Sequence, residues 1–126
     1  MKENVRFYRC NICGNIIGLI HGDMEHMQCC GQKLELLKAN STDAATEKHV
    51  PVYEKVEDEI CVKVGSTEHP MEKDHYIMWI AQVSDNTTTR IRLYPEQATT
   101  VRFKYVPNST IYAYCNKHGL WKTEVK

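Results

Sequence analysis

Apolar and polar residues alternate with a period of two along most of the chain after residue 49. The alternation is clearest at 60–64, 77–83 and 101–105, and it predicts strands that each bury one face. Shorter runs of the same kind lie at 50–53, 91–93, 111–113 and 120–125. Turn-forming pairs separate the runs: Glu57-Asp58, Asp85-Asn86, Pro95-Glu96 and Pro107-Asn108. The pattern predicts a mainly β fold whose larger part is a seven-stranded, immunoglobulin-like antiparallel β-sandwich.

The beginning of the chain follows a different pattern. Short apolar segments at 5–8, 15–20 and 33–38 predict three small strands, with a turn at Gly22 and Asp23. A domain of fewer than about 40 residues rarely buries enough apolar surface to fold alone, so a metal or a dimer partner is expected. Residues 39–48 are polar and small, which is typical of a linker. We therefore predict two domains, 1–38 and 39–126, the second beginning with this linker.

Composition and charge indicate which partners and which cellular compartment to expect. Charged residues make up 25% of the 126 residues and the formal net charge is zero, which argues against a general nucleic-acid or acidic-lipid partner. The N-terminus has no apolar core typical of a signal peptide, and no stretch approaches the roughly 20 apolar residues of a membrane span. We therefore expect a cytoplasmic protein. In that reducing compartment, clustered cysteines more often bind metal or do redox chemistry than form disulfides.

Four of the six cysteines lie in the first quarter of the chain. Cys10 and Cys13 form a Cys-x2-Cys turn, in which two sulfurs face one point and backbone N–H groups can stabilise thiolate charge. With Cys29 and Cys30 they could surround one tetrahedral ion. Adjacent cysteines reach the same ion only through a bent turn, which Gly31 would permit. Spacing alone does not choose iron over zinc, and unrelated thiols or a disulfide are the alternative.

A second group of possible ligands lies later in the chain, at predicted loops and strand ends. Cys-x2-His is a tight chelating pair, and the histidines flanking a proline-containing turn could point to the same end of the sandwich. A single histidine on a strand is usually a core or surface residue, and a chance arrangement is the alternative. The members of this group are His49, His69, His75, Cys115 and His118.

The remaining candidates receive simpler interpretations. His21 and His26 are expected to be solvated loop residues. Cys61 is expected to be a free thiol on a strand face, and Trp79 and Trp121 are expected to be core aromatics.

Together these segments resemble the desulfoferrodoxins, the two-iron class of superoxide reductases, along nearly the whole chain. The resemblance implies iron at both sites, a desulforedoxin-like or rubredoxin-like N-terminal domain, and a homodimer. It rests on Tyr8-x-Cys-x-x-Cys-Gly-Asn-Ile, Cys29-Cys30-Gly, Glu47-Lys48-His49-Val50-Pro51-Val52, His69-Pro70-Met71-Glu72, His75-Tyr76-Ile77 and Cys115-Asn116-x-His118-Gly119-x-Trp121.

The resemblance also implies the roles of individual residues. The four histidines of the second group would be equatorial iron ligands and Cys115 the axial sulfur, which leaves a sixth position for substrate. Glu47 and Lys48 would be the mobile pair beside that position. Lys48 would attract the superoxide anion or help to deliver a proton, and Glu47 would shield the position; an ordinary solvated pair is the alternative. The implied reaction is one-electron reduction of superoxide to hydrogen peroxide without oxygen production, a detoxification supplied by a rubredoxin-like or reductase electron donor.

Two other functions fit the residues without the resemblance. The protein could be an electron carrier with two iron centres and no substrate, or a structural zinc protein. The four-cysteine iron, finally, could pass electrons to the second iron or serve only structure and dimerisation.

Overall fold

A computed structural model describes residues 5–126 of the chain. The described residues separate into two compact units, one reaching to Lys38 and the other covering Ala39–Lys126. We call them the N-terminal unit and the C-terminal unit and describe each by itself.

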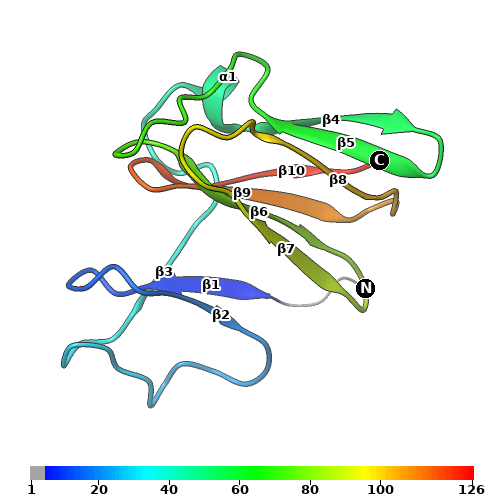
Figure 1. The fold of residues 1–126 in the computed structure, drawn as a ribbon. Helices are drawn as coiled ribbons and strands as arrows, with labels where there is room; N and C mark the ends of the chain where they lie inside the picture. The colour runs from blue at the N-terminus through cyan, green and yellow to red at the C-terminus, as the bar shows by residue number, and fades with distance from the viewer. Residues whose placement is uncertain (1–4) are drawn as a thin grey trace. The chain divides into compact units, whose positions relative to one another are not determined.

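The N-terminal unit is a three-stranded antiparallel sheet with little buried surface. The sheet has the order β2-β1-β3, where β1 is Arg6–Arg9, β2 is Ile16–Leu19 and β3 is Glu35–Leu36 (Figure 1). Its buried apolar side chains are Phe7, Tyr8 and Cys10. So small a core agrees with the expectation that the unit needs a metal or a partner to be stable.

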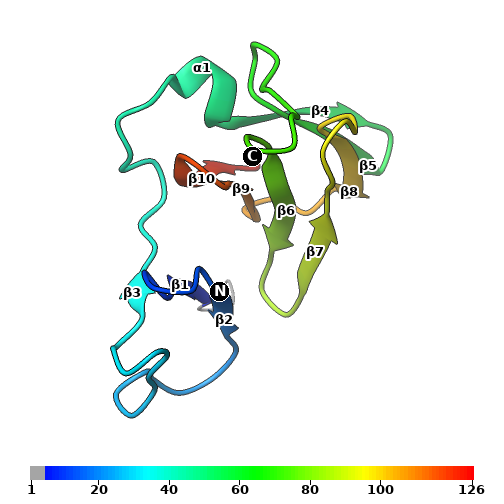
Figure 2. The ribbon, with the colours of Figure 1, turned by 60° about the vertical axis from the view of Figure 1, so that its left-hand side comes forward.

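The C-terminal unit is an antiparallel β-sandwich (Figures 1 and 2). One sheet has the order β10-β9-β6-β7 and the other the order β4-β5-β8. In an immunoglobulin-type sandwich, β4, β5 and β8 correspond to strands A, B and E, while β6, β9 and β10 correspond to C, F and G. The strands are β4 (Pro51–Val56), β5 (Glu59–Val64), β6 (Ile77–Val83), β7 (Thr88–Arg92), β8 (Thr100–Lys104), β9 (Thr110–Cys115) and β10 (Gly119–Glu124).

The core lies between these two sheets, where the period-two pattern of the sequence puts the apolar side chains. In β5 the burial alternates so that Ile60, Val62 and Val64 are buried. They face residues of the other sheet such as Ile80 and Ile111, which are also fully buried. The predicted mainly β fold, with a small four-cysteine unit followed by a sandwich, is confirmed.

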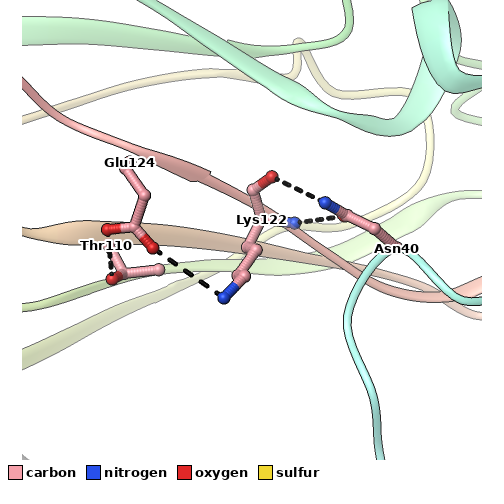
Figure 3. Close-up of polar contacts among 4 residues, drawn as sticks. All are labelled: Asn40, Thr110, Lys122 and Glu124. Carbon is pink, nitrogen blue, oxygen red and sulfur yellow. Dashed lines mark hydrogen bonds and ion pairs between the residues drawn. The ribbon is translucent and has the colours of Figure 1, made fainter.

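The segment expected to be a linker is more ordered than its composition indicates. Thr46–His49 forms the one-turn helix α1, which leads directly into β4. Asn40 acts as a short extension of the sheet at the free edge of β10, because its Oδ1 accepts from Lys122 N–H at 2.9 Å (Figure 3). Its own N–H donates to Leu120 O at 2.9 Å. Beside it the Glu124 carboxylate accepts from the Thr110 hydroxyl and pairs with the Lys122 ammonium. Asn40 therefore covers edge-strand groups that would otherwise stay open.

Candidate metal centres

Nitrogen and sulfur donors meet at one end of the sandwich. Because neighbouring strands are antiparallel, the starts of β4, β6 and β10 lie at the same end as the ends of β5 and β9. Four of the five expected ligands lie at or next to these starts and ends, and His69 lies in the loop between β5 and β6. The donor atoms of all five lie within 4.8 Å of one another. The group consists of His49, His69, His75, Cys115 and His118.

Backbone carbonyls fix which nitrogen two of these histidines present to the group. The Nδ1–H of His49 donates to Ala45 O at 2.7 Å, and the Nδ1–H of His69 donates to Pro70 O at 2.6 Å. A neutral imidazole that donates through Nδ1 has a lone pair on Nε2. Both rings are therefore held with the Nε2 lone pair free to bind a metal. Metal-binding histidines commonly have this arrangement, with the second nitrogen hydrogen-bonded to a carbonyl.

The free nitrogens lie unusually close together. His49 Nε2 is 3.1 Å from His69 Nε2 and 3.1 Å from His118 Nδ1. Lone pairs facing each other at this distance repel, and one proton can relieve only one of the two contacts. Nitrogens bound to one ion at 2.0–2.1 Å and at right angles are about 3 Å apart. The spacing fits a metal cation between the rings.

Burial makes these imidazoles harder to protonate, so protons compete less with a metal for the ring nitrogens. Desolvation lowers the pKa of His69 to about 4 and lowers the pKa values of His49 and His75, and the neighbouring imidazoles add to the effect. His75 Nε2 is also buried without a hydrogen-bond partner in the described structure. A buried nitrogen without a partner is costly in an apolar surrounding, and a metal bond would satisfy it.

Cys115 is the sulfur donor of the group. It is completely buried at the end of β9, and its Sγ lies 3.9 Å from His118 Nδ1. Burial raises the pKa of its thiol, while backbone N–H groups of Lys117 and His118 oppose the rise. These N–H groups favour the thiolate, the form that binds metal.

Two residues that sequence reasoning did not assign to the site hold it in shape. Trp121 stacks on His49, and its Nε1–H donates to His118 O at 3.0 Å. Asn116 joins the turn after β9 to the start of β6, because its Oδ1 accepts from Tyr76 N–H at 2.9 Å and its Nδ2 donates to Asp74 O at 3.0 Å. Trp121 was expected only as a core aromatic, and its 2% exposure agrees with that role.

The N-terminal unit holds the second group of donors. The Sγ atoms of Cys10, Cys13, Cys29 and Cys30 lie within 4.8 Å of one another. Sγ of Cys29 is 3.4 Å from that of Cys13 and 4.0 Å from that of Cys30. Four sulfurs bound at 2.3 Å around a tetrahedral ion are about 3.8 Å apart, so the group has the size of such a site.

Local backbone geometry explains how adjacent cysteines reach the same point. Cys30 has φ 53° and Gly31 has φ 75°, so both adopt the left-handed conformation. The bent turn predicted for this pair is present. In the Cys-x2-Cys turn, N–H groups of Cys13 and Ile12 lower the pKa of Cys10 to about 6, as predicted for this type of turn. Hydrogen bonding with Cys10 and Cys13 raises the pKa of Cys29.

The other chemical candidates lie outside both groups. His21 and His26 are exposed, as predicted, and Cys61 is a half-buried free thiol. Glu47 and Lys48 are exposed on α1, and the next residue is the buried His49. None of the helices in the described part of the chain is long and apolar enough to span a membrane.

Comparison with known proteins identifies the family. The model of the desulfoferrodoxin family matches residues 41–124, and the model of its N-terminal domain matches residues 2–37. The chain belongs to the desulfoferrodoxin family. The two donor groups fit the two irons of this family, one in the four-cysteine group and one in the group of four histidines and one cysteine.

Individual desulfoferrodoxins are similar over their whole length. The desulfoferrodoxin of Syntrophotalea carbinolica is 43% identical over 98% of this chain and 99% of its own. The desulfoferrodoxin homolog of Archaeoglobus fulgidus is 40% identical over the same shares. The crystal structure of the superoxide reductase from Treponema pallidum aligns with a TM-score of 0.75 and 29% identity, over 96% of this chain and 99% of that chain. These similarities support an oxidoreductase role.

Proposed function

We propose that this desulfoferrodoxin is a superoxide reductase that works at the group of four histidines and one cysteine. The observation that carries the proposal is the crowding of that group. His49 Nε2 lies 3.1 Å from both His69 Nε2 and His118 Nδ1, carbonyl groups fix the tautomers of His49 and His69, and the Cys115 sulfur lies 3.9 Å from His118 Nδ1. Such a donor set suits a redox-active first-row metal, and five ligands would leave one position of a six-coordinate ion for an anion. The similarity to superoxide reductases supports superoxide as the substrate.

The proposed reaction converts superoxide, one electron and two protons into hydrogen peroxide and produces no oxygen. Iron(II) bound by these five residues would supply the electron and an open coordination position, and a rubredoxin-like protein or a reductase would return the electron. The Cys115 thiolate would donate electron density to the metal, as in haem–thiolate enzymes.

Glu47 and Lys48 are the residues that we propose act on the substrate. With a net charge of zero, the protein exerts no long-range attraction on an anion, so any attraction acts within a Debye length of about 8–10 Å. Lys48 is exposed and directly precedes His49, so its ammonium would attract superoxide and could orient a water that delivers a proton. Glu47 would shield the open position from other anions.

We further propose that residues 1–38 form a separate desulforedoxin-like domain whose iron supports structure or electron supply. We propose that residues 39–126 form the catalytic domain. The active form would be a cytoplasmic homodimer that detoxifies reactive oxygen species.

The test is a pulse of superoxide mixed with the reduced two-iron protein. We expect oxidation of the histidine-bound iron at close to the diffusion limit, one hydrogen peroxide per iron oxidised, and no oxygen. A pure electron carrier would not consume superoxide at this rate, and a zinc protein would show neither colour nor oxidation. Oxygen evolution without an external reductant would indicate a dismutase and would contradict the proposal.

The role of Lys48 is tested by Lys48→Ile at low ionic strength. We expect the association rate with superoxide to fall by about 10-fold, because steering by charge changes on-rates by factors of ten or more. Lys104→Ile is the matched control. Lys104 is an exposed lysine of β8, and its register partner is Glu59, at the end of β5 opposite to the donor group. Equal rates for Lys48→Ile and the control would remove the steering role.

A further inference from the structure

The backbone just after β5 packs unusually closely against the backbone of α1. Gly65 follows β5, is buried and has φ +70°. A Cβ atom on Gly65 would overlap the carbonyl oxygen of Glu47 and would lie 2.7 Å from the Cα of Lys48. Real Cβ atoms essentially never come within 3.0 Å of such atoms. Position 65 therefore admits only glycine unless α1 moves.

Hydrogen bonds join the same two segments. The Thr67 N–H donates to Glu47 O at 2.9 Å, and the Ser66 hydroxyl donates to the same oxygen at 3.3 Å. The last four carbonyl groups of a helix receive no hydrogen bond from within the helix. In the one-turn α1, the Glu47 oxygen therefore needs an N–H or O–H donor from elsewhere. Residues 65–67, which we call the 65–67 turn, supply it.

The 65–67 turn is fixed to the core of the sandwich. Val64, directly before it, is 1% exposed and pairs with Pro51, the first residue of β4. The backbone of Glu47 and Lys48 is therefore held at two points: by the 65–67 turn and, three residues on, by the start of β4. Between the two points His49 directs its ring into the donor group.

We propose that Gly65 is a positioning residue, which by its close approach to α1 fixes the backbone of Lys48 and so the place from which its ammonium attracts superoxide. This inference rests on the proposed function of Lys48. The Coulomb energy of a charge and an anion depends on their separation, so displacement of α1 by a new Cβ would weaken the attraction. Gly65 itself need not touch the substrate.

A double-mutant cycle on the two-iron protein tests the inference. We expect Gly65→Ala to lower the rate of superoxide reduction by about 3- to 10-fold at low ionic strength and to reduce the dependence of that rate on salt. In the Lys48→Ile background the same substitution should change the rate by less than about 2-fold, because coupled residues are not additive. Gly22→Ala is the matched control, since Gly22 has φ +94° and no atom within 4 Å of its added Cβ.

Equal rate losses in both backgrounds would overturn the inference, because Gly65 would then act by a route other than Lys48. A rate for Gly65→Ala equal to that of Gly22→Ala would overturn it too. If Gly65→Ala does not fold, Thr67→Pro takes its place in the cycle. Proline removes the N–H that Glu47 O accepts, whereas the control Thr67→Ala changes an exposed side chain and keeps it.

Amide hydrogen exchange separates this inference from the proposed function. If Lys48→Ile leaves the rate unchanged, the steering role of Lys48 fails, and with it the positioning of its charge by Gly65. Whether the 65–67 turn fixes the backbone of Glu47 and Lys48 is then measured by hydrogen exchange of the Thr67 N–H. Faster exchange in Gly65→Ala than in Gly22→Ala supports that hold. Unchanged exchange removes it, whatever Lys48 does.

Discussion

The indole ring of Trp121 stacks on the imidazole of His49, with centroids 4.9 Å apart and an angle of 24° between the rings. The indole N–H also donates to His118 O, so one side chain contacts two members of the donor group. Supporting residues of this kind hold ligands in their binding orientation.

Loss of this support should weaken the histidine-bound metal. We expect Trp121→Leu to lower metal affinity by about 10- to 100-fold, the usual effect of removing an outer contact of a ligand. Trp121→Phe keeps a ring for stacking but loses the N–H, so its metal affinity should lie between those of Trp121→Leu and the unaltered protein. Competition with a chelator measures the affinities. Equal affinities for Trp121→Leu and the unaltered protein would contradict the supporting role.

Removal of one donor should empty one site and leave the other. His75 belongs to the C-terminal unit, and the four cysteines belong to the N-terminal unit. We therefore expect His75→Ala to reduce the iron content from two to one per chain and abolish superoxide reduction, while the colour of the four-cysteine iron persists. His26→Ala, which changes an exposed histidine, is the control. Retained activity in His75→Ala would show that the site is assigned wrongly.

The reverse substitution should spare catalysis. In Cys13→Ser the four-cysteine iron is expected to be lost or altered, but no donor of the histidine group lies within residues 5–38. We expect the rate constant for superoxide to stay within about 2-fold of the original value, since every donor of the histidine group belongs to the C-terminal unit. A rapid superoxide pulse measures it. A large decrease would mean that the four-cysteine iron takes part in the reaction.

Without metal, stability should fall in acid because of the buried histidines. The pKa of His69 is about 4 in the folded protein, whereas an unfolded histidine titrates near 6.5. Between these values the unfolded chain binds more protons, so the free energy of unfolding decreases as pH falls from about 6.5 to about 4. We expect a loss on the order of 2–3 kcal/mol from His69.

Urea unfolding of metal-free protein at pH 7, 5.5 and 4.5 measures this loss. His69→Leu removes the titrating group, so its free energy of unfolding should depend less on pH. His26→Gln, an exposed position, should keep the original dependence. A flat profile for the unaltered protein would contradict the burial of a neutral imidazole.

Asn40 offers a test of the edge of β10. Asn40→Ala removes the side-chain bonds to Lys122 and leaves a side chain at φ 60°, and we expect it to cost about 2 kcal/mol. Asn40→Gly tolerates that φ and should cost about 1 kcal/mol. Chemical denaturation of the two-iron protein measures both values. Equal costs would show that the backbone conformation at this position contributes little.

The strands and the donor residues were predictable from local signals. The burial alternation of β5 follows directly from Ile60, Val62 and Val64, and the bend at Cys30 follows from the need of adjacent thiols to face one point. The histidines stand out in the sequence because several of them occur at predicted strand ends and because their surrounding segments resemble one family.

The contacts that shape the site were not predictable in this way. Gly65 lies against Glu47, and Trp121 lies on His49, only because the sandwich brings distant segments together. Asn40 lies in a polar segment whose composition is typical of a linker, and its bonds to β10 join positions 82 residues apart. Period and composition describe neighbours along the chain, so they carry no information on such pairs.

The two donor groups differ in how much chain each must bring together. In the four-cysteine group, Cys10 and Cys29 are 19 residues apart, whereas His49 and His118 are separated by 69. Contacts between distant residues form late, because the entropy of closing the intervening loop opposes them. On a ribosome, the thiols are complete once residue 30 has emerged, while the histidine group waits for the final hairpin. The order of synthesis therefore favours metal capture by the N-terminal unit first.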